Sequence, residues 1–193
     1  MSRMLRILIA DNESIVRMDL HEMLEKAGHE VVAEAKDGHE AVILAKRYRP
    51  DLVIMDIKMP RMDGLEATRM ISGEGYAPIL LLTAFSQPEI VKRATDSGAM
   101  AYLVKPVQEA QLFPAMEIAL SRWRELRQLG DDLEQAKGAL EARKTLDRAK
   151  GILMKAHSLT EQEAYRRIRK YSMEHRRSIQ DVAEAIVRAA EKN

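Results

Sequence analysis

The sequence predicts an α/β domain built on a five-stranded, parallel, doubly wound sheet, followed by a long helix and a small three-helix bundle. Within the first 120 residues, short apolar and β-branched runs alternate five times with segments of helical periodicity. Beyond residue 107, the apolar residues follow helical spacing alone. Residues 1–120 hold 14 Lys and Arg against 18 Asp and Glu, whereas residues 121–193 hold 17 against 12. This asymmetry indicates a nucleic-acid or membrane contact in the basic part.

The composition excludes several classes of protein. With 193 residues, the chain has room for one full domain and a smaller one. The absence of cysteine excludes disulfides, thiolate catalysis and Cys-ligated zinc. The apolar run before Asp11 is too short for a signal-peptide core, and no later segment approaches membrane-spanning length. We therefore expect a cytoplasmic protein without a membrane partner.

The elements of the first domain follow in order. We expect strands at residues 7–10, 31–33, 52–56, 78–83 and 101–104. We expect helices at residues 14–27, 38–48, 65–71 and 88–98, with Gly28 as a C-cap and Pro88 in a first turn. The run 52–56 is apolar throughout, which is typical of a strand covered by helices on both faces. Five such strands require right-handed crossovers.

Polar residues stand where four of these strands end. Asp11 and Asn12 follow the first strand, Asp56 ends the third, Thr83 the fourth, and Lys105 follows the fifth. In an open α/β sheet these ends share one edge, where ligands bind. Each residue alone could be an ordinary strand-end polar group. Together, oxygen ligands suit Mg²⁺, and a lysine with a hydroxyl suits a phosphoryl group.

Residues 5–120 resemble the receiver domain of two-component response regulators, which has a flavodoxin-like fold. The resemblance is carried by Ile9-Ala10-Asp11, by Val53-Ile54-Met55-Asp56-Ile57-Lys58-Met59-Pro60 with Met62-Asp63-Gly64, by Leu82-Thr83-Ala84, and by Ala101-Tyr102-Leu103-Val104-Lys105-Pro106. These motifs stand at the ends of four of the five predicted strands.

This resemblance implies a role for each residue at the predicted edge. Asp56 would accept a phosphoryl group from a sensor histidine kinase, and Lys105 would pair with the phosphoryl oxygens. Thr83 and Tyr102 would form the switch that repacks the face of the fourth and fifth strands. The implied Mg²⁺ ligands are Asp11, Asn12, Asp56 and the backbone carbonyl of Lys58. Transfer to a carboxylate needs mainly positioning and charge neutralisation, which these groups provide.

The chain departs from the receiver pattern at one position. Receivers usually carry two adjacent acids after the first strand, and here the pair is Asp11-Asn12. The amide offers a carbonyl oxygen but one negative charge fewer, so we expect weaker Mg²⁺ binding and slower phosphorylation. A pseudo-receiver that never takes phosphate is the alternative.

A connecting helix is expected at residues 108–145. Its apolar residues Leu126, Leu129, Leu133, Ala136 and Leu140 are spaced by three and four, as in a coiled-coil seam. Gly130 and Gly138 weaken the pattern, and the alternative is a single amphipathic helix packed on its own chain. We expect pairing with a second copy, and therefore a homodimer when the protein is active.

The remaining sequence predicts a small bundle with a basic exterior. Thr160 begins a capping box, and Ser178 caps a last helix. The expected core consists of Ile152, Leu153, Ile168, Val182 and Ile186. Between residues 143 and 177 there are 11 Lys and Arg against 4 Asp and Glu. A cluster of charged residues is often no more than a solvent-exposed face. An excess of positive charge of this size, however, favours contact with the phosphates of a nucleic acid.

Residues 126–187 resemble the ANTAR domain, the RNA-binding output module of transcription antiterminators. The matching residues are Leu140, Arg143-Lys144, Ala149-Lys150-Gly151-Ile152-Leu153-Met154, Ala164-Tyr165, Ile168-Arg169, Ile179, Val182-Ala183 and Ile186-Val187. The resemblance implies binding to paired hairpins with small loops in a leader transcript, which prevents terminator formation. The candidate RNA contacts are Arg143, Lys144, Arg148, Lys150 and Arg169.

Together these features predict a response regulator in which phosphorylation of Asp56 promotes pairing of two chains and binding to leader RNA. The alternatives are a DNA-binding response regulator and a phosphosignalling adaptor that acts through protein contacts. We expect no small-molecule substrate and no enzyme activity beyond phosphotransfer and dephosphorylation at Asp56 itself. A phosphatase is disfavoured because Lys58 stands where such enzymes require a second acid.

Overall fold

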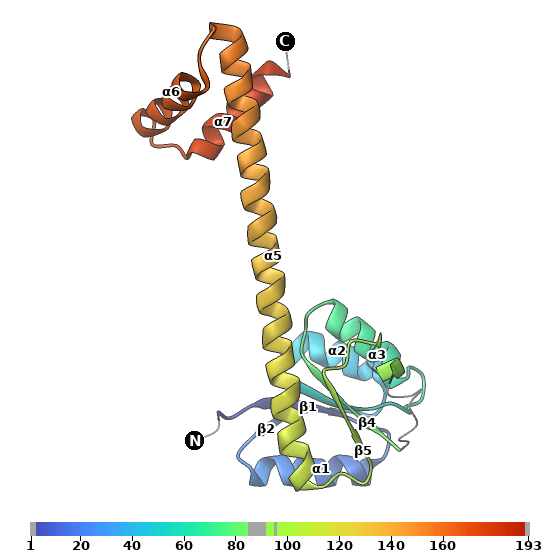
Figure 1. Ribbon diagram of the computed structural model, residues 1–193. Coiled ribbons are helices and arrows are strands. Elements are labelled where there is room, and N and C mark those ends of the chain that lie inside the picture. Colours follow the sequence, from blue (N-terminus) through green and yellow to red (C-terminus); the bar gives the residue numbers. More distant parts are fainter. Residues whose placement is uncertain (1–2, 85–91, 95, 192–193) are drawn as a thin grey trace. The chain divides into compact units, whose positions relative to one another are not determined.

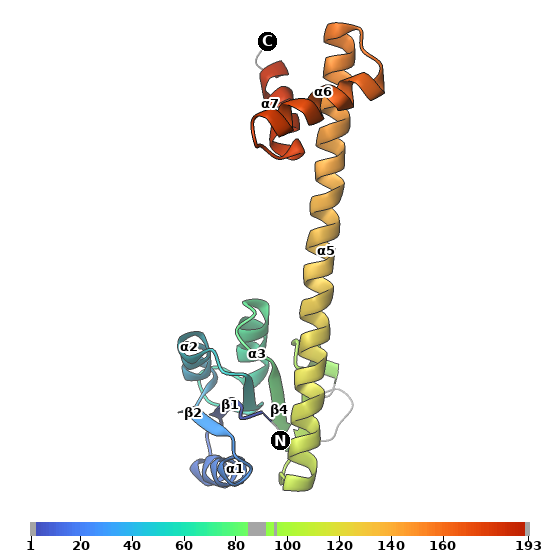
Figure 2. The same cartoon turned by 90° about the vertical axis from the view of Figure 1, so that its left-hand side faces the viewer.

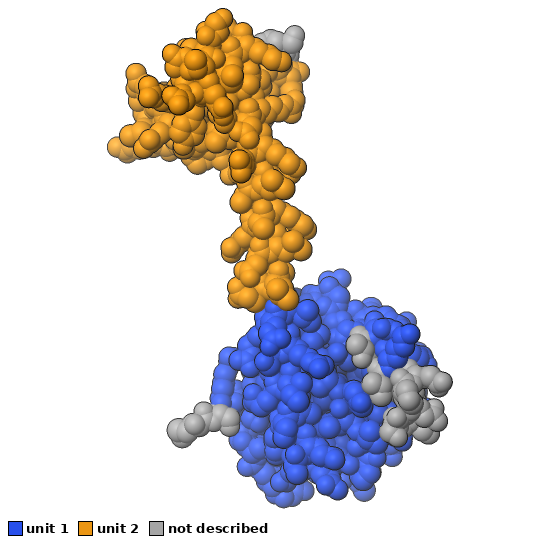
Figure 3. Space-filling view, in the orientation of Figure 1, with its two compact units in different colours: residues 1–127 blue, residues 128–193 orange. Residues whose placement is uncertain are grey.

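The structure is a computed structural model that describes residues 3–84, 92–94 and 96–191. The chain divides into two compact units, residues 1–127 and residues 128–193, which Figure 3 shows in separate colours. Among the described residues, no helix has an apolar stretch long enough to cross a bilayer.

The first unit is organised around a parallel sheet of five strands (Figure 1). The strands are β1 (Arg6–Ala10), β2 (Glu30–Ala35), β3 (Leu52–Asp56), β4 (Ile79–Thr83) and β5 (Ala101–Val104). Their order is β2-β1-β3-β4-β5, and every neighbouring pair is parallel. The predicted doubly wound fold is confirmed. β1 lies between β2 and β3, so the order reverses beside β1, and ligands bind at such switch points.

Helices cover both faces of the sheet (Figure 2). Side chains alternate along each strand: Leu8 and Ala10 of β1 pack with helices α2 (Gly38–Tyr48) and α3 (Gly64–Gly73), whereas Ile7 and Ile9 pack on the other face. That other face is covered by α1 (Ser14–Lys26) and by the first turns of α5 (Glu109–His157). β3 and β4 are buried along their whole length, which explains their uninterrupted apolar sequences.

The bounds differ from the predicted ones mainly at two places. The helix expected from Pro88 to Gly98 falls largely outside the described residues, although residues 92–94 and 96 are helical. The long helix has 49 residues and includes Pro114. Proline removes one backbone donor, and this loss is tolerated because Leu112, Ala115 and Met116 bury the same turns against the sheet.

The second unit is a small bundle formed by the end of α5, α6 (Glu161–Glu174) and α7 (Ile179–Ala190). Its buried core consists of Ala149, Ile168, Val182, Ala183 and Val187, with Leu146, Ile152, Leu153, Ile179 and Ile186 packed around them. Both short helices begin with a complete capping box, Thr160 with Glu163 and Ser178 with Asp181. The predicted three-helix bundle is therefore present, and the end of the long helix is one of its members.

The predicted seam on α5 is exposed to solvent. Leu126, Leu129, Leu133 and Leu140 each expose 54–64% of their surface. Within the described part of the chain, these leucines do not join any buried cluster. The structure therefore does not show the alternative arrangement, in which the apolar stripe of this helix packs against its own chain.

Ile168 is the central core residue of the bundle, and its truncation should loosen the second unit. Ile168→Ala leaves a cavity under α6 and α7 and should lower the free energy of opening in this unit by about 2–5 kcal/mol. Hydrogen exchange of the α6 amides measures this free energy. The matched control is Met173→Ala on the same helix, where the side chain is 70% exposed and a change within about 0.5 kcal/mol is expected. Equal protection in both variants would contradict the packing described here.

Candidate functional site

A notch lies at the carboxyl edge of the sheet, where β1 and β3 are neighbours. Lys105 extends between two buried carboxylates, with its Nζ 2.7 Å from Asp11 Oδ2 and 3.2 Å from Asp56 Oδ1. Glu13 Oε1 lies 3.6 Å from the same nitrogen. The backbone N–H of Lys105 donates to the Thr83 carbonyl at 2.8 Å, which holds β4 beside the lysine. Residues from four strand ends therefore meet at one place.

Burial dominates the electrostatics of this notch. Burial raises the pKa of Asp56, and the neighbouring charge of Asp11 raises it further, while Lys105 partly offsets both. Burial alone would lower the pKa of Lys105, but its contacts with Asp11 and Asp56 outweigh burial and leave that pKa raised. The lysine is therefore a fixed positive charge between the two acids.

A cavity of about 230 Å³ adjoins the two acids. It is lined by Asn12, Glu13, Asp56, Ile57, Lys58, Thr83, Ala84 and Lys105. Tyr102 does not line it; this ring belongs to β5 and is 42% exposed. The structure thus brings together the residues predicted at the strand ends, whereas Tyr102, the second residue of the implied switch, lies on β5 outside the cavity lining.

The donor set of the notch is of the kind that suits a magnesium ion. In the described part of the chain, no three acidic, His or Cys residues form a metal cluster. The candidate oxygen donors are the carboxylates of Asp11 and Asp56, which contact Lys105, together with Asn12 and Lys58, which line the cavity. Mg²⁺ takes one or two carboxylates and completes its octahedron with water and phosphate oxygens. These residues therefore fit Mg²⁺ together with a phosphoryl group.

The second candidate site is the basic exterior of the bundle. Three of the five predicted RNA contacts pair with carboxylates: Lys144 with Glu141 at 2.7 Å, Arg148 with Glu191 at 3.0 Å, and Lys150 with two partners. Among the described residues, Arg143 and Arg169 form no salt bridge. The structure therefore divides the predicted cations into paired and unpaired groups.

Lys150 is the clearest paired case. Its Nζ lies 2.7 Å from Asp147 Oδ1 on α5 and 2.6 Å from Glu161 Oε1 at the start of α6, and its side chain is only 13% exposed. This lysine ties two helices of the bundle together, a role that its position in a basic run does not reveal.

Two family models match the chain. The response regulator receiver domain matches residues 7–117, and the ANTAR domain matches residues 134–187. A relative described as transcriptional regulatory protein PdtaR, from Mycobacterium tuberculosis, is 50% identical over 182 residues, which covers 94% of this chain and 89% of the relative.

The chain is a response regulator with an ANTAR domain.

Solved receiver domains share the fold of the first unit. The receiver domain of the putative response regulator NarL from M. tuberculosis has a TM-score of 0.59 at 29% identity and covers 62% of this chain and 98% of its own. A complex from Borrelia burgdorferi, described as CheX-CheY-BeF3-Mg+2, has a TM-score of 0.55 at 29% identity and covers 57% and 84%. Receiver domains bind Mg²⁺ at the site of phosphorylation, and the Borrelia complex itself includes that ion.

Gly64 is one residue of the receiver domain whose role was not anticipated. Its backbone N–H donates to the Ile57 carbonyl at 2.8 Å, which folds the loop after β3 back on itself. A Cβ at this position would collide with the carbonyl oxygen of Asp56. The sequence signal was present in the Asp63-Gly64 pair, because a glycine directly after a helix N-cap marks a close backbone approach.

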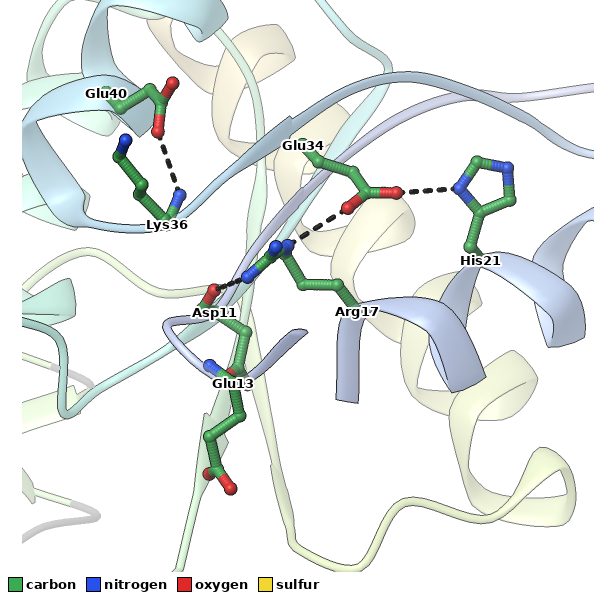
Figure 4. A network of polar contacts seen from close by, with 7 residues as sticks. All are labelled: Asp11, Glu13, Arg17, His21, Glu34, Lys36 and Glu40. Atoms are coloured by element: carbon green, nitrogen blue, oxygen red, sulfur yellow. Dashed lines mark hydrogen bonds and ion pairs between the residues drawn. The ribbon is translucent and has the colours of Figure 1, made fainter. Parts of the chain in front are cut away.

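Arg17 is a second residue that sequence reasoning missed, and Figure 4 shows its surroundings. Its guanidinium donates to the backbone carbonyl of Asp11 at 2.7 Å and to Glu34 Oε2 at 3.0 Å. Glu34 Oε1 also contacts His21 Nδ1 at 2.9 Å. Helix α1 is thereby fixed to β2, and the backbone of Asp11 is held in place.

His21 makes this network dependent on pH. Its hydrogen bond to Glu34 raises the pKa of His21 above the ordinary 6.5, burial opposes this, and Glu25 adds to the increase. A raised folded-state pKa gives stability below pH 6.5 that is lost as the pH rises through the raised value. The melting temperature of His21→Gln should therefore fall below that of the wild type at about pH 5.5, and the difference should shrink by about pH 8.5.

The control for this prediction is Glu34→Gln, which removes the principal partner of His21. In this background the pH-dependent part of the His21→Gln effect should largely disappear. The effect should be small, because the imidazole is 36% exposed and solvent screens the pair. A difference in melting temperature that stays constant across this pH range would contradict the assignment.

Proposed function

We propose that this response regulator accepts a phosphoryl group on Asp56 from a sensor histidine kinase and, once phosphorylated, binds paired hairpins in leader RNA to cause transcription antitermination in the cytoplasm. The single observation that carries the proposal is the position of Lys105 between Asp11 and Asp56 in a domain joined to an ANTAR domain. The alternative roles, a DNA-binding regulator and a protein-binding adaptor, require different ligands for the same basic surface.

The chemistry follows from the notch. A carboxylate oxygen of Asp56 attacks the phosphorus, the bond to the kinase histidine breaks, and the product is an acyl phosphate. Lys105 pairs with the phosphoryl oxygens, and Asp11, Asn12, Asp56 and the Lys58 carbonyl would hold Mg²⁺. When bound, that ion neutralises charge on the transferring group. Hydrolysis of the acyl phosphate resets the domain, and no further catalysis is proposed.

The output step joins the two domains through α5. In this proposal Thr83 and Tyr102 rearrange after phosphorylation, which repacks the surface of β4 and β5. That change favours pairing of two copies through residues 108–145, and the exposed leucines of α5 support such pairing. Two bundles on one dimer could then bind two adjacent hairpins, and bivalency would raise affinity without new contacts.

Phosphorylation of Asp56 can be tested with a small phosphodonor and Mg²⁺. The intact mass of the wild type should rise by one phosphoryl group, and Asp56→Asn should show no rise. The matched variant Asn12→Asp restores a second acid and should tighten Mg²⁺ binding about tenfold, with faster phosphorylation, because each added carboxylate strengthens attraction to the ion. No mass gain in either the wild type or Asn12→Asp would overturn the phosphoacceptor role.

RNA binding can be tested with the transcript that copurifies with the protein. Affinity for its paired hairpins should fall by about 10³ or more between roughly 50 and 200 mM salt, because phosphate contacts release counterions. The phosphorylated protein should bind more tightly and elute as a dimer. Tighter binding to duplex DNA would support the DNA-binding alternative, and weak, salt-insensitive binding would support the adaptor. Equal affinity and equal oligomeric state before and after phosphorylation would disprove the coupling.

A further inference from the structure

The ANTAR domain contains a cavity that has no role in the function proposed above. It has a volume of about 340 Å³ and lies among the end of α5, α6 and α7. Its lining residues are Leu153, His157, Arg167, Ile168, Tyr171, Arg177, Val182, Ala185, Ile186 and Ala189. None of the five cations predicted to contact RNA is among them. The volume is within the range of roughly 300–1,000 Å³ that is typical of pockets for small organic groups.

The cavity combines an apolar floor with an aromatic wall. Ile168 and Val182 are buried beneath it. Tyr171 lines it while remaining 48% exposed, and its ring stacks on His175 with centroids 3.9 Å apart and planes 16° apart. Because His175 covers one face of the tyrosine, the orientation of the ring beside the cavity is restricted. A preorganised ring beside an apolar floor suits a flat, unsaturated group.

Two arginines supply positive charge at this cavity. Arg167 precedes Tyr171 by one helical turn on α6, so the two side chains share a face. Arg177 lies in the loop before α7, where its N–H donates to the Ser172 carbonyl at 3.0 Å and its own carbonyl accepts from the Ser172 hydroxyl at 2.6 Å. Within the described residues, neither guanidinium has a salt-bridge partner. Neither is held by a carboxylate of the described chain within salt-bridge distance, although Arg177 also lines a second cavity with Asp181 and Glu184.

We propose that this cavity binds one unstacked nucleobase from an RNA hairpin loop, stacked against Tyr171, while Arg167 and Arg177 contact the flanking phosphates. The proposal rests on the proposed RNA-binding function and adds to it a base-specific subsite. Loop bases that leave the RNA stack are bound in this way, by aromatic or guanidinium planes with cations along the backbone. The Tyr171–His175 pair is the aromatic platform, and the cavity beside it admits a single base.

The charge at the cavity argues against its being a contact between two copies of this chain. A second copy would present the same unpaired arginines, and like charges would face each other across the contact. An RNA loop has the opposite charge, together with a flat aromatic group that matches the apolar floor. Charge complementarity therefore selects RNA over self-association.

The test is a double-mutant cycle between the protein and its RNA. The probe is a synthetic two-hairpin RNA copied from the copurifying transcript, with each loop nucleotide replaced in turn by an abasic site. Tyr171→Ala should weaken binding of the intact RNA about tenfold, which is typical of the loss of one base–aromatic stack. One abasic position should cause a similar loss. At that position the two changes together should cost no more than either alone, because they remove the same contact.

Matched variants separate stacking from charge and from folding. Tyr171→Phe should retain nearly full affinity, and Ala185→Met should block the cavity and reproduce the loss. Tyr165→Ala changes another exposed tyrosine of α6, which does not line the cavity, and should have little effect. Arg167→Gln should lower the slope of log affinity against log salt by about 0.7–0.9, whereas Tyr171→Ala should leave that slope unchanged.

The outcomes distinguish this inference from the proposed function. If the wild type shows no salt-sensitive binding to the two-hairpin RNA, the RNA-binding function fails and the base subsite fails with it. If the wild type binds, the fold-losses in affinity caused by Tyr171→Ala and by an abasic site can be compared at each loop position. If these losses multiply at every position, the tyrosine and the base act independently, and only the subsite is overturned. A change in oligomeric state caused by Ala185→Met, with unchanged RNA affinity, would assign the cavity to self-association and also overturn it.

Discussion

The arrangement of the receiver domain depends on one charge interaction, the bridge that Lys105 makes between Asp11 and Asp56. Two carboxylates buried side by side repel each other strongly at low dielectric, and the lysine offsets that repulsion from 2.7 and 3.2 Å. The three residues come from the ends of β1, β3 and β5, so their meeting requires the whole sheet in register. Arg17 and Gly64 support the bridge indirectly, because one fixes the backbone of Asp11 and the other lets the loop after β3 close.

Of the three residues in this bridge, Lys105 lies nearest in sequence to α5. Lys105 is followed within four residues by Glu109, the first residue of that helix. The first turns of α5 bury Leu112, Ala115 and Met116 against the same sheet face as α1. A displacement of Lys105 toward a new anion on Asp56 would therefore act directly on the start of α5. Such a displacement would be passed on through residues 106–108, which join Lys105 to the start of α5.

Much of the notch could be predicted from the sequence because topology brings strand ends together. Once the apolar runs are assigned to parallel strands, Asp11, Asp56, Thr83 and Lys105 must share an edge. The same reasoning could not find the contact from Arg17 to Asp11, or the position of Lys150 between Asp147 and Glu161. The partners of a long cationic side chain depend on where neighbouring helices and strands are placed. Helical periodicity predicts which face of a helix is buried, but it does not predict which element packs against that face. The cavity beside Tyr171 could not be predicted either, because it depends on how α5, α6 and α7 pack together.

The charge of the notch bears on what Asn12 would do in the proposed phosphorylation of Asp56. Two carboxyl groups and one lysine give these three residues a formal net charge of −1, and a second acid at position 12 would make it more negative. In the proposed function, phosphorylation would replace the single charge of Asp56 with about −2 and add strong acceptor oxygens. The amide weakens attraction for a divalent ion, but it also lowers the repulsion that an incoming phosphoryl group meets. In the proposed function, Asn12 would therefore leave more of the charge neutralisation to Lys105, and the position of that lysine would depend more strongly on whether Asp56 carries phosphate.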